Sequence, residues 1–149
     1  MPNTPPDQPS RPVYNVVFEE IEHTADWALR VRGRDLAELL VNAARGMVSL
    51  LAADPTAIPT NVKQQVELES IDPESLLVDW LSELAYWTET EGVIFHQFDM
   101  QAVTTTSLQA TVHGGQAADL KKHIKAVTYH NLEIVETGQG LEVTVVFDV

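Results

Sequence analysis

Residues 72–92 read DPESLLVDWLSELAYWTETEG, and this stretch predicts a long amphipathic helix with a marked start and a marked end. Asp72 is a good capping side chain, and Pro73 suits the first helical position because the N–H that proline lacks would be unpaired there. Gly92 is a natural C-cap. The apolar side chains between them recur at helical spacing: Leu76, Leu77, Trp80, Leu81, Leu84 and Trp87. One face of this helix must therefore pack against a core.

A second helix is predicted upstream of this one. Asp35 is its expected N-cap, the helix runs to about Ala53, and Asp54-Pro55 stops it. Its apolar positions are Leu36, Leu39, Leu40, Ala43, Met47, Val48 and Leu51. The spacing of these residues indicates that this helix also turns one face to the core.

The other segments alternate between apolar and polar residues, as strands do. We expect strands at 14–18, 27–33, 62–68, 93–103, 107–113, 126–134 and 141–147, with glycine turns at 114–115 and 138–140. The order strands, helix, strand, helix, strands predicts an α+β fold, a single domain with two helices packed on a mostly antiparallel β-sheet. We expect this domain to occupy residues 13–149, after a disordered N-terminal tail at residues 1–12.

The composition is that of one ordinary globular domain. The chain has 149 residues, 44% of them hydrophobic, and no apolar run approaches the ~18 residues that span a bilayer. The Pro-rich residues 1–12 lack the apolar core of a secretory signal, and the absence of cysteine excludes disulfides and thiolate metal sites. We therefore expect a cytoplasmic protein that does not associate with membranes.

The charge of the chain is strongly acidic. Its 22 Asp and Glu residues against 9 Lys and Arg residues give a formal net charge of −13. Proteins that bind nucleic acid directly place Lys and Arg against phosphate, so we expect no direct, tight nucleic-acid binding. An acidic surface suits a cation or a basic protein partner, although negative charge can also simply aid solubility.

The familiar signatures of enzymes are missing from the sequence, which contains no GxxxxGK[ST], no GxGxxG after a strand, no HExxH and no GxSxG. None of the five histidines shows the paired spacing of metal ligands: His23, His96, His113, His123 and His130. We therefore expect that the chain is not an enzyme.

Two places combine oxygen ligands. The polar turn His23-Thr24-Ala25-Asp26 can gather side-chain and carbonyl oxygens around a hard cation such as Ca²⁺ or Mg²⁺. The alternative is that its side chains only hydrogen-bond the local backbone. At the other end of the sequence, the side-chain carboxylate of Asp148 lies close to the terminal carboxylate of Val149. Two such groups repel each other unless a cation or basic group lies between them.

A basic segment, residues 121–125 (KKHIK), interrupts the acidic sequence. It is suited to contact a phosphate or nucleotide on the surface of a partner. The alternative is solvated charge on an edge strand, where lysines discourage aggregation.

Six segments occur in an order that resembles the archease family: HTAD at 23–26, AARG at 43–46, LVDWL at 77–81, ETEG at 89–92, KAVTYH at 125–130 and FDV at 147–149. The resemblance runs from about Tyr14 to Val149, and HTAD and KAVTYH are its most specific parts. Archeases serve RtcB-type RNA ligases, which join 2′,3′-cyclic-phosphate or 3′-phosphate ends to 5′-hydroxyl ends using GTP and a divalent metal. The resemblance implies an accessory protein that promotes guanylylation and multiple turnover of such a ligase, in tRNA splicing or RNA repair.

The resemblance also implies which residues act. It assigns a divalent ion, Ca²⁺ or one of the Mg²⁺/Mn²⁺ class, to Asp26, Asp148 and Val149. It makes Lys125 an expected contact to the ligase or its phosphate groups, together with His23 and His130. Two departures from the family pattern stand out. The HTAD turn continues as Trp27-Ala28 where Ile-Gly is usual, and the segment between Gly115 and Lys125 is short, which leaves the role of His123 open.

Two other functions are alternatives to ligase activation. A chaperone-like protein-binding module would expose apolar surface to unrelated clients. A small metal-dependent phosphohydrolase would use the same carboxylates, but it also needs a general base and a substrate pocket.

Overall fold

The computed structural model describes residues 17–22 and 27–149. In these residues the chain forms two α-helices, a short 3₁₀ helix and eight strands. The helices are α1 (Leu36–Leu51), η2 (Pro55–Ala57) and α2 (Pro73–Glu91). The strands are β1 (Phe18–Glu22), β2 (Trp27–Gly33), β3 (Val62–Glu69), β4 (Val93–Val103), β5 (Ser107–Gln116), β6 (Ala126–Thr128), β7 (Val135–Thr137) and β8 (Gly140–Asp148).

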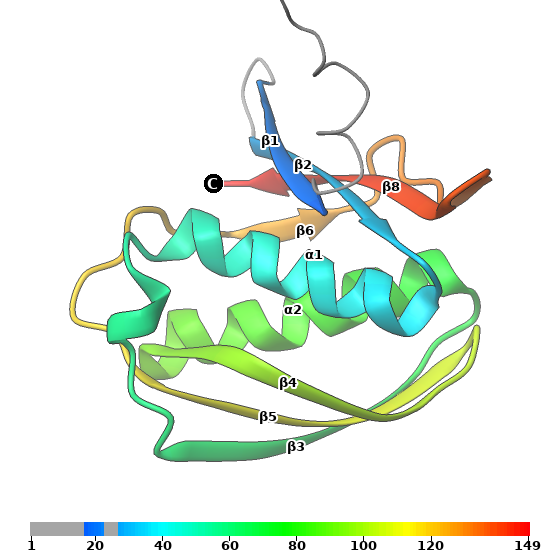
Figure 1. Cartoon of the computed structure of the whole chain (residues 1–149). Helices are drawn as coiled ribbons and strands as arrows, with labels where there is room; N and C mark the ends of the chain where they lie inside the picture. The colour runs from blue at the N-terminus through cyan, green and yellow to red at the C-terminus, as the bar shows by residue number, and fades with distance from the viewer. Residues whose placement is uncertain (1–16, 23–26) are drawn as a thin grey trace, which may run out of the picture.

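The strands of the described part pair into two antiparallel sheets, and the two long helices lie between them (Figure 1). One sheet has the order β1-β2-β8-β6, with β7 also pairing with β8, and the other has the order β3-β5-β4. Each helix contacts strands of both sheets. The α+β class with two helices in a single domain is confirmed, and the structure adds that the strands cover the helices from two sides.

Burial of α1 on more than one face explains this arrangement. Its buried residues are Leu39, Leu40, Asn42, Ala43, Ala44, Gly46, Met47, Val48, Leu50 and Leu51. A helix that is apolar nearly all round must be covered on both sides. At Gly46 a Cβ would come within 2.9 Å of the Leu29 side chain and 3.1 Å of the Phe18 ring. A small residue at this position therefore lets the β1-β2-β8-β6 sheet approach the helix closely.

The helix ends follow the expected chemistry. The carboxylate of Asp35 accepts from the Glu38 N–H at 2.9 Å, and that of Asp72 accepts from the Ser75 N–H at 2.7 Å. Gly92 adopts φ 70° and donates to the Thr88 carbonyl, which confirms it as the C-cap of α2. The first helix ends at Leu51, slightly before the predicted end, because Ala52 is already extended and η2 begins after Asp54.

Two strand predictions need correction. Strand β5 does not stop before the glycine pair but continues to Gln116, because at Gly114 a Cβ would collide with the backbone of Ile94 on β4 and only glycine allows that close pairing. The strand predicted over 126–134 ends at Thr128, because the chain turns at Asn131, whose φ is 50°. The next strand, β7, starts only at Val135.

Part of the N-terminal prediction lies outside the described residues. This holds for the tail at 1–12, for the domain start at 13 and for the first part of the strand predicted over 14–18. Strand β1 is described from Phe18 to Glu22 and pairs with β2.

A single hydrophobic core unites both sheets and both helices. Its largest fully buried side chains include Trp80 and Phe147, and the Trp80 indole N–H donates to the Leu40 carbonyl at 2.9 Å. This buried hydrogen bond joins α2 to α1 and satisfies a polar group that would otherwise be costly to bury. None of the helices in the described residues is long and apolar enough to cross a membrane.

Candidate functional site

The end of β8 is held between two other strands. On one side, Phe147 pairs with Trp27 at the start of β2, and on the other, Asp148 pairs with Ala126 at the start of β6. The strand can end here in a polar residue because Phe147 is fully buried and anchors it to the core. The Asp148 side chain is exposed, and half-buried Val149 packs against the core. The structure thus presents the Asp148 carboxylate to solvent from a rigid strand end.

Lys125 lies directly beside this strand end. Its backbone N–H donates to the Asp148 carbonyl oxygen at 2.7 Å, although the two residues are far apart in the sequence. Both side chains are exposed, and within the described part of the chain no ion pair engages the Lys125 ammonium or the Asp148 carboxylate. The strand end therefore brings the backbones of Lys125 and Asp148 together, and both charged groups are unpaired within the described residues.

His130 lies at the far end of β6 from this pair. Thr128, two residues before it, pairs with Val146 rather than with the end of β8. The backbone N–H of His130 donates to Thr128 Oγ1 at 3.3 Å, and its ring nitrogen lies 3.3 Å from the Asn131 amide. The structure therefore does not bring His130 together with Asp148.

Two of the expected site residues, His23 and Asp26, lie outside the described residues. The structure describes the chain again from Trp27, which pairs with Phe147, so β2 starts alongside the last residues of β8. Within residues 17–22 and 27–149, no group of three or more His, Asp or Glu side chains is arranged to hold a metal ion. The described residues contribute Asp148 and Val149 to the expected set of ligands.

The basic segment 121–125 is an irregular loop, and the edge-strand interpretation is wrong. Side-chain contacts fasten it to three elements. The Lys121 ammonium donates to the Ser49 carbonyl on α1 at 3.1 Å, and the Lys122 ammonium lies 3.5 Å from the centroid of the Trp27 ring. His123 Nδ1 lies 3.1 Å from the Glu89 carboxylate on α2. The loop is thereby held against the start of β2.

The sequence did not predict the contacts of Trp27 and Glu89. Trp27 stood out there only as a departure from Ile-Gly, and the structure shows that its ring stacks against a lysine of the shortened segment. Glu89 belongs to the ETEG segment, but nothing in its local pattern indicates that it would meet His123. Such contacts join residues distant in sequence, so periodicity carries no signal for them.

Comparison with known proteins decides the family. The sequence model of the Archease protein family (MTH1598/TM1083) matches residues 18–149. The chain belongs to the archease family. Two relatives named Protein archease cover 89% of this chain and 95% of their own length: that of Methanosarcina barkeri is 35% identical and that of Methanosarcina acetivorans 36% identical, each over 140 residues.

Solved structures agree with this archease fold. The solution structure of Methanobacterium thermoautotrophicum protein 1598 has a TM-score of 0.73 at 29% identity and covers 89% of this chain and 99% of its own. The crystal structure of a Thermotoga maritima archease, described as a possible chaperone, has a TM-score of 0.60 at 24% identity and covers 88% and 96%. The second likeness shows the fold alone.

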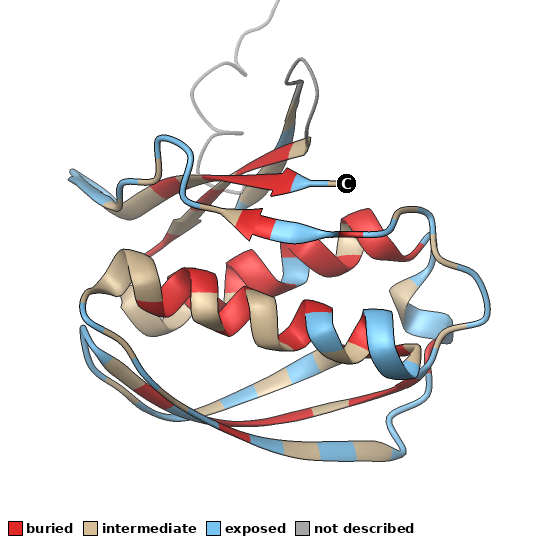
Figure 2. Ribbon diagram, turned by 180° about the vertical axis from the view of Figure 1, so that it is seen from behind, coloured by how far each residue is buried: buried red, intermediate tan, exposed pale blue. Residues whose placement is uncertain are grey.

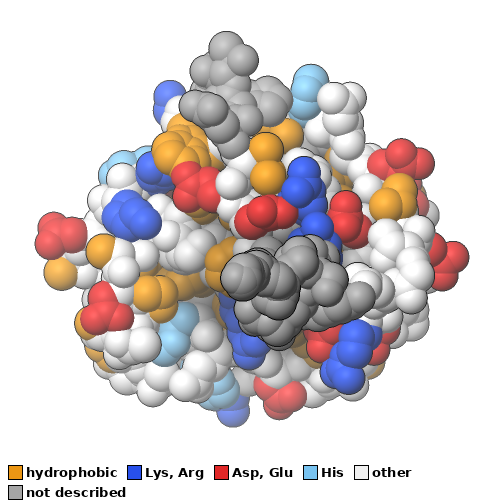
Figure 3. Space-filling model, turned by 45° about the horizontal axis from the view of Figure 1, so that its top comes forward, with side chains coloured by type: hydrophobic (Ala, Val, Ile, Leu, Met, Phe, Trp, Pro, Cys, Tyr) orange, Lys and Arg blue, Asp and Glu red, His pale blue; other side chains and the backbone are white. Residues whose placement is uncertain are grey.

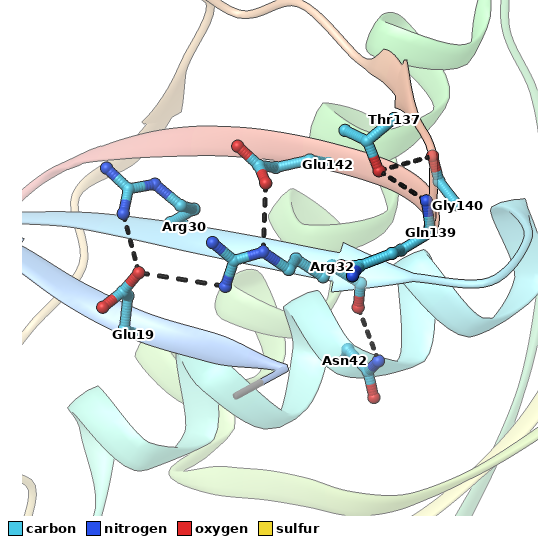
Figure 4. A network of polar contacts seen from close by, with 8 residues as sticks. All are labelled: Glu19, Arg30, Arg32, Asn42, Thr137, Gln139, Gly140 and Glu142. Atoms are coloured by element: carbon cyan, nitrogen blue, oxygen red, sulfur yellow. Dashed lines mark hydrogen bonds and ion pairs between the residues drawn. The ribbon is translucent and has the colours of Figure 1, made fainter. Parts of the chain in front are cut away.

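On the outer face of the β1-β2-β8-β6 sheet, this archease neutralises several of its own charges (Figure 4). The Glu19 carboxylate lies 2.7 Å from the Arg30 guanidinium and 3.9 Å from that of Arg32, which in turn lies 3.0 Å from Glu142. Figure 3 shows acidic and basic side chains interleaved over this part of the surface. These ion pairs therefore add little net charge beside the strand end that carries Asp148.

Proposed function

We propose that this archease activates an RtcB-type RNA ligase by promoting its GTP-dependent guanylylation and its multiple turnover, in tRNA splicing or RNA repair. The observation that carries the proposal is the juxtaposition of Lys125 and Asp148. It joins the two family segments KAVTYH and FDV at one strand end, beside the start of the strand that follows HTAD. Three segments distant in sequence therefore converge on one place.

The chemistry of these residues suits a hard divalent ion. Asp148 offers an exposed carboxylate without an ion-pair partner in the described residues, and Val149 follows it. Ca²⁺ takes about six to eight oxygen ligands and Mg²⁺ prefers few carboxylates with retained waters, so a site of this kind needs Asp26 as well. Asp26, Asp148 and Val149 would hold the ion, which would be Ca²⁺ or one of the Mg²⁺/Mn²⁺ class. When bound, it would supply the positive charge that offsets phosphate groups during nucleotidyl transfer.

Lys125 would contact phosphate at the edge of this site. Its ammonium is exposed and unpaired within the described residues, while its backbone is fixed by the hydrogen bond to Asp148. A flexible ammonium on a fixed backbone is well suited to follow a phosphate oxygen. His23 and His130 would make further contacts to the ligase, His130 from the other end of β6.

The net charge of −13 supports a protein partner rather than RNA as the primary ligand. An acidic activator is drawn to the basic face of an RNA-binding enzyme, which speeds encounter and favours transient engagement. In this proposal the archease is not itself an enzyme, because the ligase performs the bond-forming steps.

A chaperone-like function is the second candidate, and the Thermotoga maritima archease has itself been described as a possible chaperone. The large apolar side chains exposed in the described part are Val17, Ile71, Tyr86, Tyr129 and Val135. They lie in β7, just before β1, and at or beside α2 and β6, whereas a general chaperone needs a contiguous apolar patch. Suppression of aggregation of unrelated clients, without stimulation of the ligase, would favour this alternative.

The test is multiple-turnover joining of RNA by the cognate ligase with GTP and divalent metal. We expect the archease to raise the number of turnovers, and Asp26→Ala and Asp148→Ala to lose the effect. Asp99→Ala is the matched control, because Asp99 is an exposed carboxylate on β4 in the other sheet. Equal rates with and without the wild-type protein would refute the proposal.

A further inference from the structure

A groove lies between α2 and β6, next to the candidate site. It has a volume of about 230 Å³. Figure 2 shows the exposed last turns of α2 lying below β6 on the same side of the molecule. The residues that line the groove are Ser82, Ala85, Tyr86, Glu89, Ile124, Lys125, Ala126 and Val127.

The lining is apolar at the bottom and aromatic at one wall. Ala85, Ile124 and Val127 are buried, whereas Tyr86 is 63% exposed. Within the described part of the chain, the Tyr86 ring packs against no other aromatic ring and its hydroxyl makes no hydrogen bond. A large aromatic side chain left open beside an apolar floor is typical of a binding anchor.

Two charged side chains line the groove: the Glu89 carboxylate at the C-terminal end of α2 and the Lys125 ammonium just before β6. Glu89 and Glu91 lie in the last turn of the helix, which contains no Lys or Arg. This end of a helix carries the negative end of its dipole, so carboxylates are unfavourable there and a cation is favourable. His123 contacts one oxygen of the Glu89 carboxylate, and no other described side chain hydrogen-bonds it.

We propose that this groove receives an arginine side chain from a basic protein partner. The planar guanidinium would stack on the exposed ring of Tyr86 and donate to the Glu89 carboxylate, while its aliphatic stem covers the apolar floor. Arginine fits better than lysine because only its flat, forked head group can both stack and bind a carboxylate with two parallel hydrogen bonds.

The groove lies beside the candidate metal site. Lys125 lines the groove, and its backbone N–H is bonded to Asp148. An arginine held between Tyr86 and Glu89 would therefore dock the partner immediately beside the candidate metal site. The identity of the partner as the RtcB-type ligase rests on the proposed function.

The test measures the affinity of the cognate ligase for archease variants by biolayer interferometry, alongside the joining rate at saturating archease. We expect Tyr86→Ala and Glu89→Gln each to weaken binding about tenfold, in the range of a cation–π or charge-assisted contact, while the saturated joining rate is retained. Tyr86→Phe keeps the ring and should bind as the wild type does. His123→Ala removes the hydrogen bond that tethers the loop to α2, which Glu89→Gln can keep through its amide, and it leaves the carboxylate in place, so it should not weaken binding.

Unchanged affinity in Tyr86→Ala and Glu89→Gln would overturn the inference, and so would an equal loss in His123→Ala, which would point to the loop tether instead. These outcomes are distinguishable from failure of the proposed function. If wild-type archease stimulates the ligase and Asp148→Ala does not, the activator function stands whatever the groove variants do. If the wild-type protein neither binds nor stimulates the ligase, both proposals fall.

Discussion

The backbone N–H of Lys125 donates a 2.7 Å hydrogen bond to the carbonyl oxygen of Asp148. This bond joins the loop before β6 to the end of β8. Because only backbone atoms take part, the two side chains stay free to act on something outside the protein. The geometry of the candidate site is thus fixed by the sheet and does not depend on the side chains that carry its chemistry.

This separation predicts how Lys125 responds to substitution. We expect Lys125→Ala to leave the melting temperature unchanged but to lower ligase stimulation about tenfold, since it removes one charge-assisted contact to phosphate. In contrast, Lys125→Pro removes the backbone donor and should destabilise the protein by about 1–3 kcal/mol in urea unfolding. Full stimulation by Lys125→Ala would show that the ammonium has no part in the activity.

Metal binding should depend on the Asp148 carboxylate. We expect Asp148→Asn to weaken Ca²⁺ or Mn²⁺ binding at least about tenfold in isothermal titration calorimetry, because a neutral amide replaces a charged oxygen ligand. Asp99→Asn, on the opposite sheet, should leave the affinity unchanged. Equal affinity in both variants would place the ion elsewhere.

The contact between Lys122 and Trp27 should be measurable as a coupling energy. The ammonium lies 3.5 Å from the ring centroid, and exposed contacts of this kind contribute about 0.5–1 kcal/mol. We expect a double-mutant cycle of Lys122→Met and Trp27→Ile, followed by urea unfolding, to give a coupling in that range. Lys63→Met on β3 is the control for the loss of one exposed lysine, and additive effects of the two site substitutions would disprove the contact.

Two glycines should respond differently to alanine. Gly92 has φ 70° at the end of α2, and a Cβ there would also meet the Gln116 side chain at 3.0 Å. We expect Gly92→Ala to reduce the free energy of unfolding by about 1–2 kcal/mol, because L-residues are strained in this conformation. Gly138→Ala should be nearly neutral, since a Cβ at that position meets no atom within 4 Å. Thermal denaturation of both variants checks the difference.

Glu38 should make stability depend on pH. Its pKa is lowered from the usual value, first by the hydrogen bond from the Arg34 backbone N–H and then by the bond from the Arg34 side chain. A carboxylate with a lowered folded-state pKa stabilises the protein above its unfolded pKa of about 4.3, and that contribution disappears as the pH falls through the folded value. We expect the difference in unfolding free energy between the wild type and Glu38→Gln to be present at pH 7 and to shrink toward zero on acidification. A difference that is constant with pH would contradict this.

Much of the local structure could be predicted because its causes are local. Asp35 and Asp72 cap their helices through N–H groups three residues away, and Gly92 ends α2 through its own backbone conformation. These interactions involve neighbouring residues, so a sequence pattern is sufficient to find them. Where the deciding contact is distant the prediction failed, as at Gly114, whose partner Ile94 lies on another strand.

The sequence by itself determined the two helices, most of the strands, the α+β class and the segments that resemble the archease family. Tertiary structure alone decided that the strands form two sheets around the helices, because alternation shows which face of a strand is buried but not which strand pairs with it. It also decided that Lys125 lies beside Asp148, that Lys122 stacks on Trp27 and that Tyr86 and Glu89 share a groove. Each of these contacts joins residues far apart in the chain, and their proximity is a property of the packed core that holds the strand ends and helix turns in place.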